Sequence, residues 1–570
     1  RPPGERPPGK RRLVPGPDLR PEPADAGWRD APVLLPFDFN HPYATFRTPV
    51  MGRRGMVATS HPLAAQIGLR ILQEGGNAAD AAVAAAAALT VLEPTSNGIG
   101  GDAFALVWDG RRLHGLNASG RAPAVLTPDV FEHRGLTEVP ADGWLPVTVP
   151  GAVSGWAELA RRFGTMPLHR LLEPAARCAE EGHPVPPVIA GYWRRAEQRF
   201  GGRPEFKDFA DAFLPGGRAP EPGQVFSCPD QARTLRLIGE SDGEAFYRGE
   251  LADRIAEHAR RTGGLLTKED LAAHRPQWVE PIRTTYRGFE VWEIPPNGQG
   301  IVALTALNIL EETPVAELPH MSAARLHLII EALRLAFADA RRFVADPEHA
   351  AVPVDQLLSK EYAARRRRLI SPAQALTDVA PGLPDRGGTV YLCAADAEGR
   401  MVSFIQSNYM GFGSGIVVPG TGIALQNRGH GFTLEEGHPN RVAPGKRPYH
   451  TIIPGFITKD GVPLAAFGVM GGDMQPQGHV HTVLGVVDHR LNPQSVFDAP
   501  RVRLAPDGSV HVESTMHPDV IRQLARLGHR IHVSAEWGGF GGGQMIWRDP
   551  ETGVLIGGTE PRKDGVVAAW

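Results

Sequence analysis

The stretch "DRGGTVYLCAADAEGRMVSFIQS", residues 385–407, decides the fold of this chain. It begins with a charged pair and two glycines, and then changes abruptly to two β-rich segments, "TVYLCAA" and "MVSFIQS". Val, Ile, Tyr, Phe and Thr favour strands, and the polar residues "DAEGR" between the segments are typical of a turn. The stretch therefore predicts two neighbouring strands, the first of which opens at Thr389, directly after Gly388.

The pattern on both sides of this stretch indicates helices. "SHPLAAQIGLRILQEGGN" predicts a helix with Ser60 as its N-cap, and Asn77 is expected to cap the alanine-rich helix that follows. Residues 301–370 are again helical, whereas residues 389–470 hold short β-rich segments between glycines and prolines. Helices around an antiparallel β-rich middle predict an α+β fold, a layered α/β/β/α sandwich, rather than a doubly wound parallel sheet.

Composition narrows the class of protein. The chain has 570 residues, of which 42% are hydrophobic and 22% charged, as expected for a globular protein with a large core. A formal net charge of −3 argues against nucleic acid and anionic membranes as partners, and a small-molecule substrate fits better. The three cysteines lack the spacing of a metal site or a disulfide framework, so we expect no metal and no cofactor.

The N-terminal segment and the longest apolar run indicate in which cellular compartment the protein is expected. The longest apolar run, residues 81–92, is too short to span a membrane and predicts a buried helix. Residues 1–45 are dense in Pro, Gly and charged residues, which predicts a disordered head without a secretory signal. A cytoplasmic protein is therefore favoured, and a periplasmic or secreted one is left open.

The junction between Gly388 and Thr389 suggests chemistry. A threonine inside a chain is a poor nucleophile, but an N-terminal threonine has its own α-amine, with a pKa of about 7.7–8.0, as a base. Thr389 could reach that state by attacking the carbonyl of Gly388 and forming an ester that water hydrolyses. The two glycines before Thr389 would allow strained backbone angles and leave this carbonyl uncovered. The alternative is that Gly-Gly-Thr is only a loop that enters a strand.

Several segments resemble landmarks of one family, in that family's order. They are "GNAADAAVAAAAALTVLEPTSNGIGGDAFALVWDG" (76–110), "VPGAVSGW" (149–156), "PPNGQGI" (295–301), "IIEALRLAFADARRFVADPE" (329–348), "TVYLCAADAEGRMVSFIQSNYMGFGSG" (389–415), "APGKRP" (443–448) and "GVMGGD" (468–473). From about residue 47 onward the chain resembles the γ-glutamyltransferases, also called glutathione hydrolases, which are self-cleaving N-terminal-nucleophile hydrolases.

This resemblance implies an architecture and a processing step. The fold would be the four-layer αββα sandwich of N-terminal-nucleophile hydrolases, formed jointly by a heavy subunit of residues 46–388 and a light subunit of residues 389–570. Autocleavage would occur between Gly388 and Thr389. The two subunits of one precursor would then remain partners, and an amide substrate would pass its acyl group to Thr389 as an ester.

The resemblance also assigns catalytic residues. Thr389 takes the position of the nucleophile, and Ser407 that of a second hydroxyl, which is usually Thr. Gly471 and Gly472 take the position of the paired glycines whose N–H groups stabilise the oxyanion, and losing one such donor typically costs about 10²- to 10³-fold in rate. Tyr409 stands where the family has Asn.

Residues of substrate recognition depart from the family. Ser119 stands where an arginine would bind the α-carboxylate of glutamate, and Arg121 is a candidate substitute. His430 replaces an acidic residue that would bind the α-ammonium group, and two serines become His450 and Thr451. The expected substrate-binding residues are Arg121, Tyr409, Asn427, Arg428, His430, His450 and Thr451. Such a pocket favours an anionic or aromatic acyl group over the zwitterionic head of glutamate.

The expected function is therefore hydrolysis of an amide, or transfer of its acyl group to an amine. γ-Glutamyl compounds such as glutathione are the family default. One alternative is a divergent acylase that acts on a glutaryl or cephalosporin-like amide. Another is a non-catalytic scaffold whose chain stays uncut, because Tyr391 stands where the family commonly has His.

Overall fold

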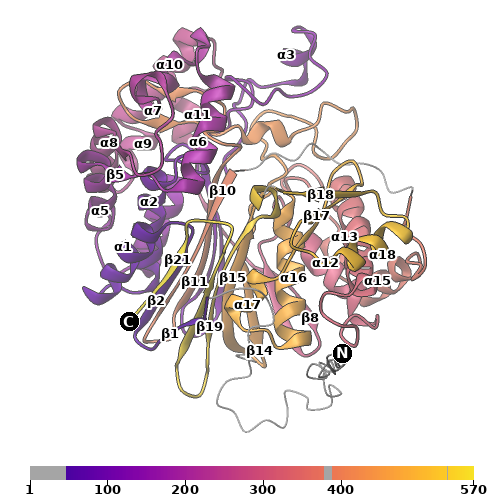
Figure 1. Cartoon of the computed structure of the whole chain (residues 1–570). Coiled ribbons are helices and arrows are strands. Elements are labelled where there is room, and N and C mark those ends of the chain that lie inside the picture. Colours follow the sequence, from indigo (N-terminus) through magenta and orange to yellow (C-terminus); the bar gives the residue numbers. More distant parts are fainter. Residues whose placement is uncertain (1–46, 378–387, 536) are drawn as a thin grey trace, which may run out of the picture. The chain divides into compact units, whose positions relative to one another are not determined.

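The computed structural model describes residues 47–377, 388–535 and 537–570. The predicted head of residues 1–45 lies outside these residues, and so does residue 387, the first glycine of the junction. Two seven-stranded sheets lie face to face with helices on both outer sides (Figure 1). The chain is thus an α+β protein with the four-layer arrangement that the sequence predicts.

Both sheets are antiparallel throughout. The first sheet has the order β21 (Val566–Ala569), β2 (Gly55–Thr59), β10 (Gly388–Asp396), β11 (Met401–Tyr409), β3 (Asp102–Trp108), β4 (Leu113–Asn117) and β7 (Gln277–Val279). The second has the order β1 (Val50–Gly52), β20 (Leu555–Thr559), β19 (Gly542–Arg548), β15 (Val462–Met470), β14 (Gly455–Lys459), β9 (Phe289–Glu293) and β8 (Ile282–Tyr286). The predicted strand pair of residues 389–407 is the hairpin β10–β11 in the first sheet.

Each sheet carries its own helical layer (Figure 1). On the first sheet lie α1 (Pro62–Gln73), α2 (Ala78–Leu92) and α4 (Ala152–Phe163); α5 (Leu168–Glu181) packs on α2, and α8 (Pro229–Glu240) packs on α5. On the second lie α12 (Gly300–Glu311), α16 (Met474–His489) and α17 (Pro493–Asp498), and α13 (Ala323–Phe343) packs on α12. None of the described helices is long and apolar enough to cross a membrane.

The strand β10 is buried on both faces. Val390, Leu392 and Ala394 pack into the core beneath the first helical layer, whereas Tyr391 and Cys393 pack into the core between the two sheets. This alternation is the two-residue period of a strand. Because both faces are covered, the strand cannot shift its register without moving apolar side chains out of the core.

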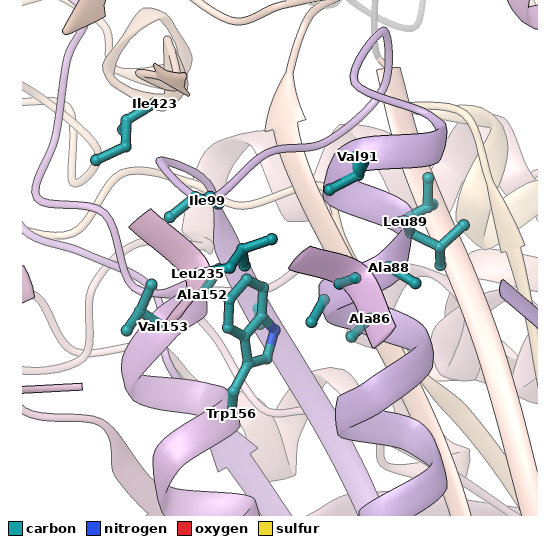
Figure 2. Close-up of a cluster of buried hydrophobic side chains, with 14 of the residues drawn as sticks. Ala86, Ala88, Leu89, Val91, Ile99, Ala152, Val153, Trp156, Leu235 and Ile423 are labelled. Atoms are coloured by element: carbon teal, nitrogen blue, oxygen red, sulfur yellow. The ribbon is translucent and has the colours of Figure 1, made fainter. Parts of the chain in front are cut away.

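The helix α2 lies directly against this strand. All of its residues are buried, and its run of alanines allows neighbouring elements to approach closely. Figure 2 shows Trp156 of α4 directed toward the alanines of α2. The indole N–H of Trp156 donates to Gln406 Oε1 at 3.0 Å, and Gln406 Nε2 donates to the carbonyl of Ala86 at 2.7 Å. These hydrogen bonds hold β11 in place at Gln406, the residue before Ser407.

The two predicted helix caps differ in outcome. Asn77 caps α2 in a capping box with Asp80, as predicted. Ser60 is not the cap of α1; the N-cap is His61, whose ring accepts from the backbone N–H of Leu63. The hydroxyl of Ser60 instead donates to Glu93 at 2.5 Å. The cap prediction is wrong because a tertiary partner engages this hydroxyl.

Tyr391 is held by a close fit between the sheets. Its hydroxyl lies 2.7 Å from Ser403 Oγ, and its ring lies over Gly468 of β15. A Cβ at position 468 would come within 2.4 Å of the ring. The side chain that replaces the family's histidine is therefore a packing element between the layers.

We expect the substitution Gly468→Ala to destabilise the protein, because the added methyl group overlaps the ring of Tyr391. Overpacking of this kind costs about 1–3 kcal/mol. Thermal unfolding measures the effect. Gly191→Ala in α6 (Pro187–Phe200) is the matched control, since a Cβ there meets nothing within 4 Å. Equal losses of stability in both variants would contradict this account of the sheet interface.

Candidate active site

The first residues of β10 lie opposite a bulge. Gly388 pairs with Tyr409 and Val390 pairs with Gln406, so Thr389 faces two residues of β11, Ser407 and Asn408. Bulges of this kind are common beside active sites, where they redirect a side chain. The side chain of Thr389 is buried.

The hydroxyl of Ser407 connects both sides of the predicted cleavage site. It donates to the carbonyl oxygen of Gly388 at 2.6 Å and accepts from Thr389 Oγ1 at 3.2 Å. It also accepts from the backbone N–H of Tyr409 at 2.8 Å and from Arg428 Nη2 at 3.2 Å. The bond to the carbonyl would strengthen as negative charge develops on that oxygen, so the geometry suits attack by Thr389 on Gly388.

The backbone around the junction is tightly packed and strained. A Cβ at position 388 would come within 3.2 Å of Ser96 Cα and of the carbonyl oxygen of Thr95. Tyr409 has a φ of 76°, in the left-handed region that a bulky side chain rarely adopts. The sequence predicts strain at the glycines, whereas among the described residues the clear outlier beside the junction is Tyr409. Strain of this kind persists only where the surrounding structure enforces it.

Arg428 contacts three other predicted site residues. Its Nη1 donates to Thr451 Oγ1 at 2.7 Å, its Nη2 donates to Ser407, and its Cζ lies 4.2 Å from the centre of the Tyr409 ring. Burial lowers the pKa of Arg428 to about 10, so the guanidinium remains charged at neutral pH. The positive charge of Arg428 is therefore connected to Thr389 Oγ1 through two hydrogen bonds, with Ser407 Oγ between them.

His450 lies on a buried carboxylate that the sequence analysis missed. Its Nε2 donates to Asp102 Oδ2 at 3.0 Å, and Asp102 Oδ1 accepts from the backbone N–H groups of Gly120 and Gly151 and from Gln426 Nε2. Burial raises the pKa of Asp102 to about 7, against the charge of Arg428, and lowers that of His450 well below its ordinary value. The sequence signal that could have identified Asp102 is an aspartate within "GIGGDAF", at the start of the buried strand β3.

The paired glycines follow β15 and precede α16. Gly471 and Gly472 have φ values of 120° and 58°, and no hydrogen bond from either N–H group is found among the described residues. The carbonyl of Gly472 accepts from Gln299 Nε2 at 3.0 Å, and the same amide donates to the carbonyl of Thr451 at 2.7 Å. Gln299, another residue that the sequence analysis did not assign to the site, thus ties the glycine pair to the segment that contacts Arg428.

The remaining predicted residues have other partners. Arg121 donates to both carboxylate oxygens of Glu348 at 2.9 Å and to the carbonyl of Gly445 at 3.0 Å. Asn427 accepts from the N–H of Met410 and donates to the carbonyl of Ala141, and His430 Nδ1 contacts the carbonyl of Val139. The structure brings Asn427 and His430 beside Tyr409, whereas Arg121 belongs to an ion pair. Their roles in binding substrate remain predictions.

One cluster among the described residues has a geometry that could hold a metal ion. The ligand atoms of His327, Glu331 and His529 lie within 4.8 Å of one another. His327 Nδ1 lies 2.8 Å from His529 Nε2, and its Nε2 donates to the carbonyl of Ser371. Glu331 accepts from Arg334 and from the N–H of Leu376. These atoms already join α13 to the segment 371–376.

Known proteins of similar sequence and structure span nearly the whole chain. Residues 64–570 match the family model described as Gamma-glutamyltranspeptidase. The glutathione hydrolase-like YwrD proenzyme of Bacillus subtilis (strain 168) is 37% identical over 524 residues, which cover 90% of this chain and 98% of that protein. The Acylase ACY 1 proenzyme of Pseudomonas sp. (strain SE83) is 35% identical over 554 residues, which cover 95% and 97%. The crystal structure of cephalosporin acylase from Bacillus halodurans has a TM-score of 0.89 at 56% identity, and covers 93% of this chain and 98% of that one.

We expect Ser407→Ala to slow cleavage of the chain by about 10²- to 10³-fold, the usual effect of losing one donor to a developing oxyanion. Intact mass spectrometry over time measures the uncut fraction. Ser403→Ala on the same strand is the control, because its hydroxyl contacts Tyr391 and the carbonyl of Phe467 instead of the junction. Equal cleavage rates in the two variants would count against a role for Ser407.

The raised pKa of Asp102 predicts how the stability of the protein depends on pH. Its pKa rises from an ordinary value of about 4 to about 7 in the fold, so its contribution to stability is fully present below the lower value and is lost as pH rises through the higher one. Two uncut proteins are compared, the Thr389→Ala variant and the same variant with Asp102→Asn added. The melting temperature of the first minus that of the second should fall between about pH 5 and about pH 8. A difference that rises over this range would contradict the raised pKa.

Proposed function

The chain belongs to the γ-glutamyltranspeptidase family, and on this premise we propose that it is a self-processing amide hydrolase or acyltransferase whose nucleophile is Thr389. The observation that carries the proposal is the position of the Ser407 hydroxyl. It lies between the carbonyl oxygen of Gly388 and the hydroxyl of Thr389, at 2.6 Å and 3.2 Å.

This geometry supports the following autocleavage. Thr389 Oγ attacks the carbonyl carbon of Gly388 while Ser407 donates to the carbonyl oxygen. A C–O bond forms, the amide C–N bond breaks, and the nitrogen of Thr389 takes the proton that its hydroxyl loses. Water then hydrolyses the ester, which leaves a heavy chain ending at Gly388 and a light chain of residues 389–570. Relatives named as proenzymes support processing of one precursor.

The same threonine would then act on substrate. Its freed α-amine accepts the proton of its hydroxyl as the oxygen attacks an amide carbonyl. The N–H groups of Gly471 and Gly472, at the N-terminal end of α16, would stabilise the oxyanion. The amine of the substrate leaves with the proton, and the acyl group stays as an ester until water or another amine takes it.

The acyl group is proposed to differ from γ-glutamyl. A γ-glutamyl head needs an acceptor for its α-ammonium group and a cation for its α-carboxylate. The carboxylate of Asp102 already accepts from four donors of the protein, and Arg121 already binds Glu348. The acylase named among the relatives supports an acylase activity here, and hydrolysis of glutathione is the competing outcome.

Intact mass spectrometry and N-terminal sequencing of the purified protein test the proposal. They should find a light chain that begins Thr-Val-Tyr-Leu. Thr389→Ala should stay uncut and inactive because a methyl group cannot attack, whereas Thr389→Ser keeps a hydroxyl and should still be cut. A wild-type chain that stays intact on long incubation would overturn the proposal and favour the scaffold.

A further inference from the structure

A cluster of three polar side chains connects the proposed heavy subunit to the proposed light subunit. His327 and Glu331 belong to α13, in the heavy subunit, and His529 lies in the light subunit, in the loop before β18 (Ile531–Ser534). All three side chains are buried, and the ligand atom that each offers lies within 4.8 Å of the other two. The two histidines are 202 residues apart in the chain, so no local sequence pattern predicts this cluster.

The residue types define the kind of ligand. His327 and Glu331 are four residues apart on a helix, so their side chains lie next to each other on one face. Two imidazoles and one carboxylate form a ligand set that binds zinc and leaves a fourth, tetrahedral position to water. Calcium and magnesium prefer oxygen ligands alone, so the mixed set favours a divalent transition metal.

The ring of His327 already has the orientation of a metal ligand. Its Nε2 donates to the carbonyl of Ser371 at 2.7 Å, which leaves the lone pair on Nδ1. This Nδ1 faces His529 Nε2 at 2.8 Å. Histidines that bind metals almost always donate their other ring N–H to a carbonyl or a carboxylate, and this bond fixes the tautomer and the ring orientation.

Glu331 is also held in place and keeps lone pairs to spare. One of its oxygens accepts from Arg334 Nε at 3.2 Å, and the other accepts from the backbone N–H of Leu376 at 2.6 Å. A carboxylate has about four acceptor positions, so these two bonds leave room for a metal. Arg334 is the nearby cation, and its charge lowers the affinity for a dication without occupying a ligand atom.

Binding requires only a small movement. Zn–N bonds of about 2.0–2.1 Å in a tetrahedral arrangement place two nitrogens about 3.4 Å apart, so the rings of His327 and His529 must separate by about 0.6 Å from their present 2.8 Å. The residues on either side of His529, Gly528 and Arg530, are exposed. The loop can therefore shift by this amount without moving apolar side chains out of the core.

We propose that His327, Glu331 and His529 form a binding site for a divalent transition-metal ion, with zinc as the best fit, and that this ion joins the two subunits. The bonds to Ser371 and Leu376 extend its effect to the segment of the heavy subunit before the junction. Its role is structural, and no step at Thr389 passes through it. The expectation of no metal came from the cysteines, which take no part in this site. Only the joining of two separate chains rests on the proposed function.

Zinc titration by calorimetry tests the site, with tag-free processed protein that a chelator has stripped of metal. We expect one ion per molecule. His529→Ala and Glu331→Gln should each weaken binding by at least about 100-fold, because even loss of a partner behind a ligand costs about 10- to 100-fold. His532→Ala is the matched control. His532 stacks on His511 with ring centroids 5.1 Å apart on the neighbouring strands, and this pair is less buried.

Three results of the titration would overturn the inference. They are no binding of zinc by the wild-type protein, equal affinity in the wild type and His529→Ala, and loss of binding in His532→Ala instead of His529→Ala. The last would identify an adventitious site on the pair His511 and His532.

Two further measurements cover variants that fail to fold. Saturating zinc should raise the melting temperature of the wild type, because an ion that binds only the folded state stabilises it. Anomalous scattering from zinc in crystals of the wild-type enzyme should give a peak between His327, Glu331 and His529. No peak at that position, or an unchanged melting temperature, would contradict the site.

The outcomes separate this inference from the proposed function. The uncut variant Thr389→Ala keeps all three ligands and should bind zinc as tightly as the wild type. If no light chain forms in the wild type and zinc still binds at the three residues, the metal site holds and the proposed function fails. If a light chain forms and no zinc binds, the proposed cleavage holds and only the metal site is wrong.

Discussion

The rest of this structure depends on the burial of β10 on both faces. Its alternate side chains pack against α2 on one side and against the second sheet on the other, so the strand has a single register. Thr389, next to the first residue of the strand, is therefore held at a fixed point of the sheet. The bulge of β11 brings Ser407 to that point, where its hydroxyl contacts both Thr389 and the carbonyl of Gly388. The chemistry of the junction thus follows from how the two layers pack.

Beside this rigid framework lies a buried set of charged and polar side chains that packing alone does not explain. Asp102, His450 and Arg428 are all fully buried, and replacing such groups with apolar residues often leaves a protein equally stable or more so. Their retention beside Thr389 is understood if they serve the ligand. Asp102 is satisfied by donors of the protein, whereas Arg428 has donors to spare. The two groups therefore differ: Asp102 holds His450 and the backbone of the site in place, whereas the Nε–H of Arg428 has no acceptor among the described residues.

This division explains how one family can include glutathione hydrolases and acylases. In the proposed reaction, the processing junction and the paired glycines act on atoms that every amide substrate shares, namely the carbonyl carbon and its oxygen. The predicted substrate-binding side chains would instead contact the part of the acyl group that differs between substrates. A scaffold of this kind can change its substrate while its reaction stays the same, and function must then be argued from the site rather than from the fold.

The amino-acid sequence by itself determined the four-layer class, the strand pair beginning at the junction, the cap at Asn77 and the candidate nucleophile Thr389. The first three depend on periodicity and on residues adjacent in the chain, and such signals are local, whereas the candidate nucleophile rests on the resemblance to a family. Only the tertiary structure decided which side chains meet. The hydroxyl of Ser60 donates to Glu93 and so caps no helix. The ring of His450 donates to Asp102, 348 residues earlier in the chain, and Arg121 donates to Glu348. Hydrogen bonds and ion pairs act over a few ångströms in space whatever the separation in sequence, and no local pattern encodes which distant partner will arrive.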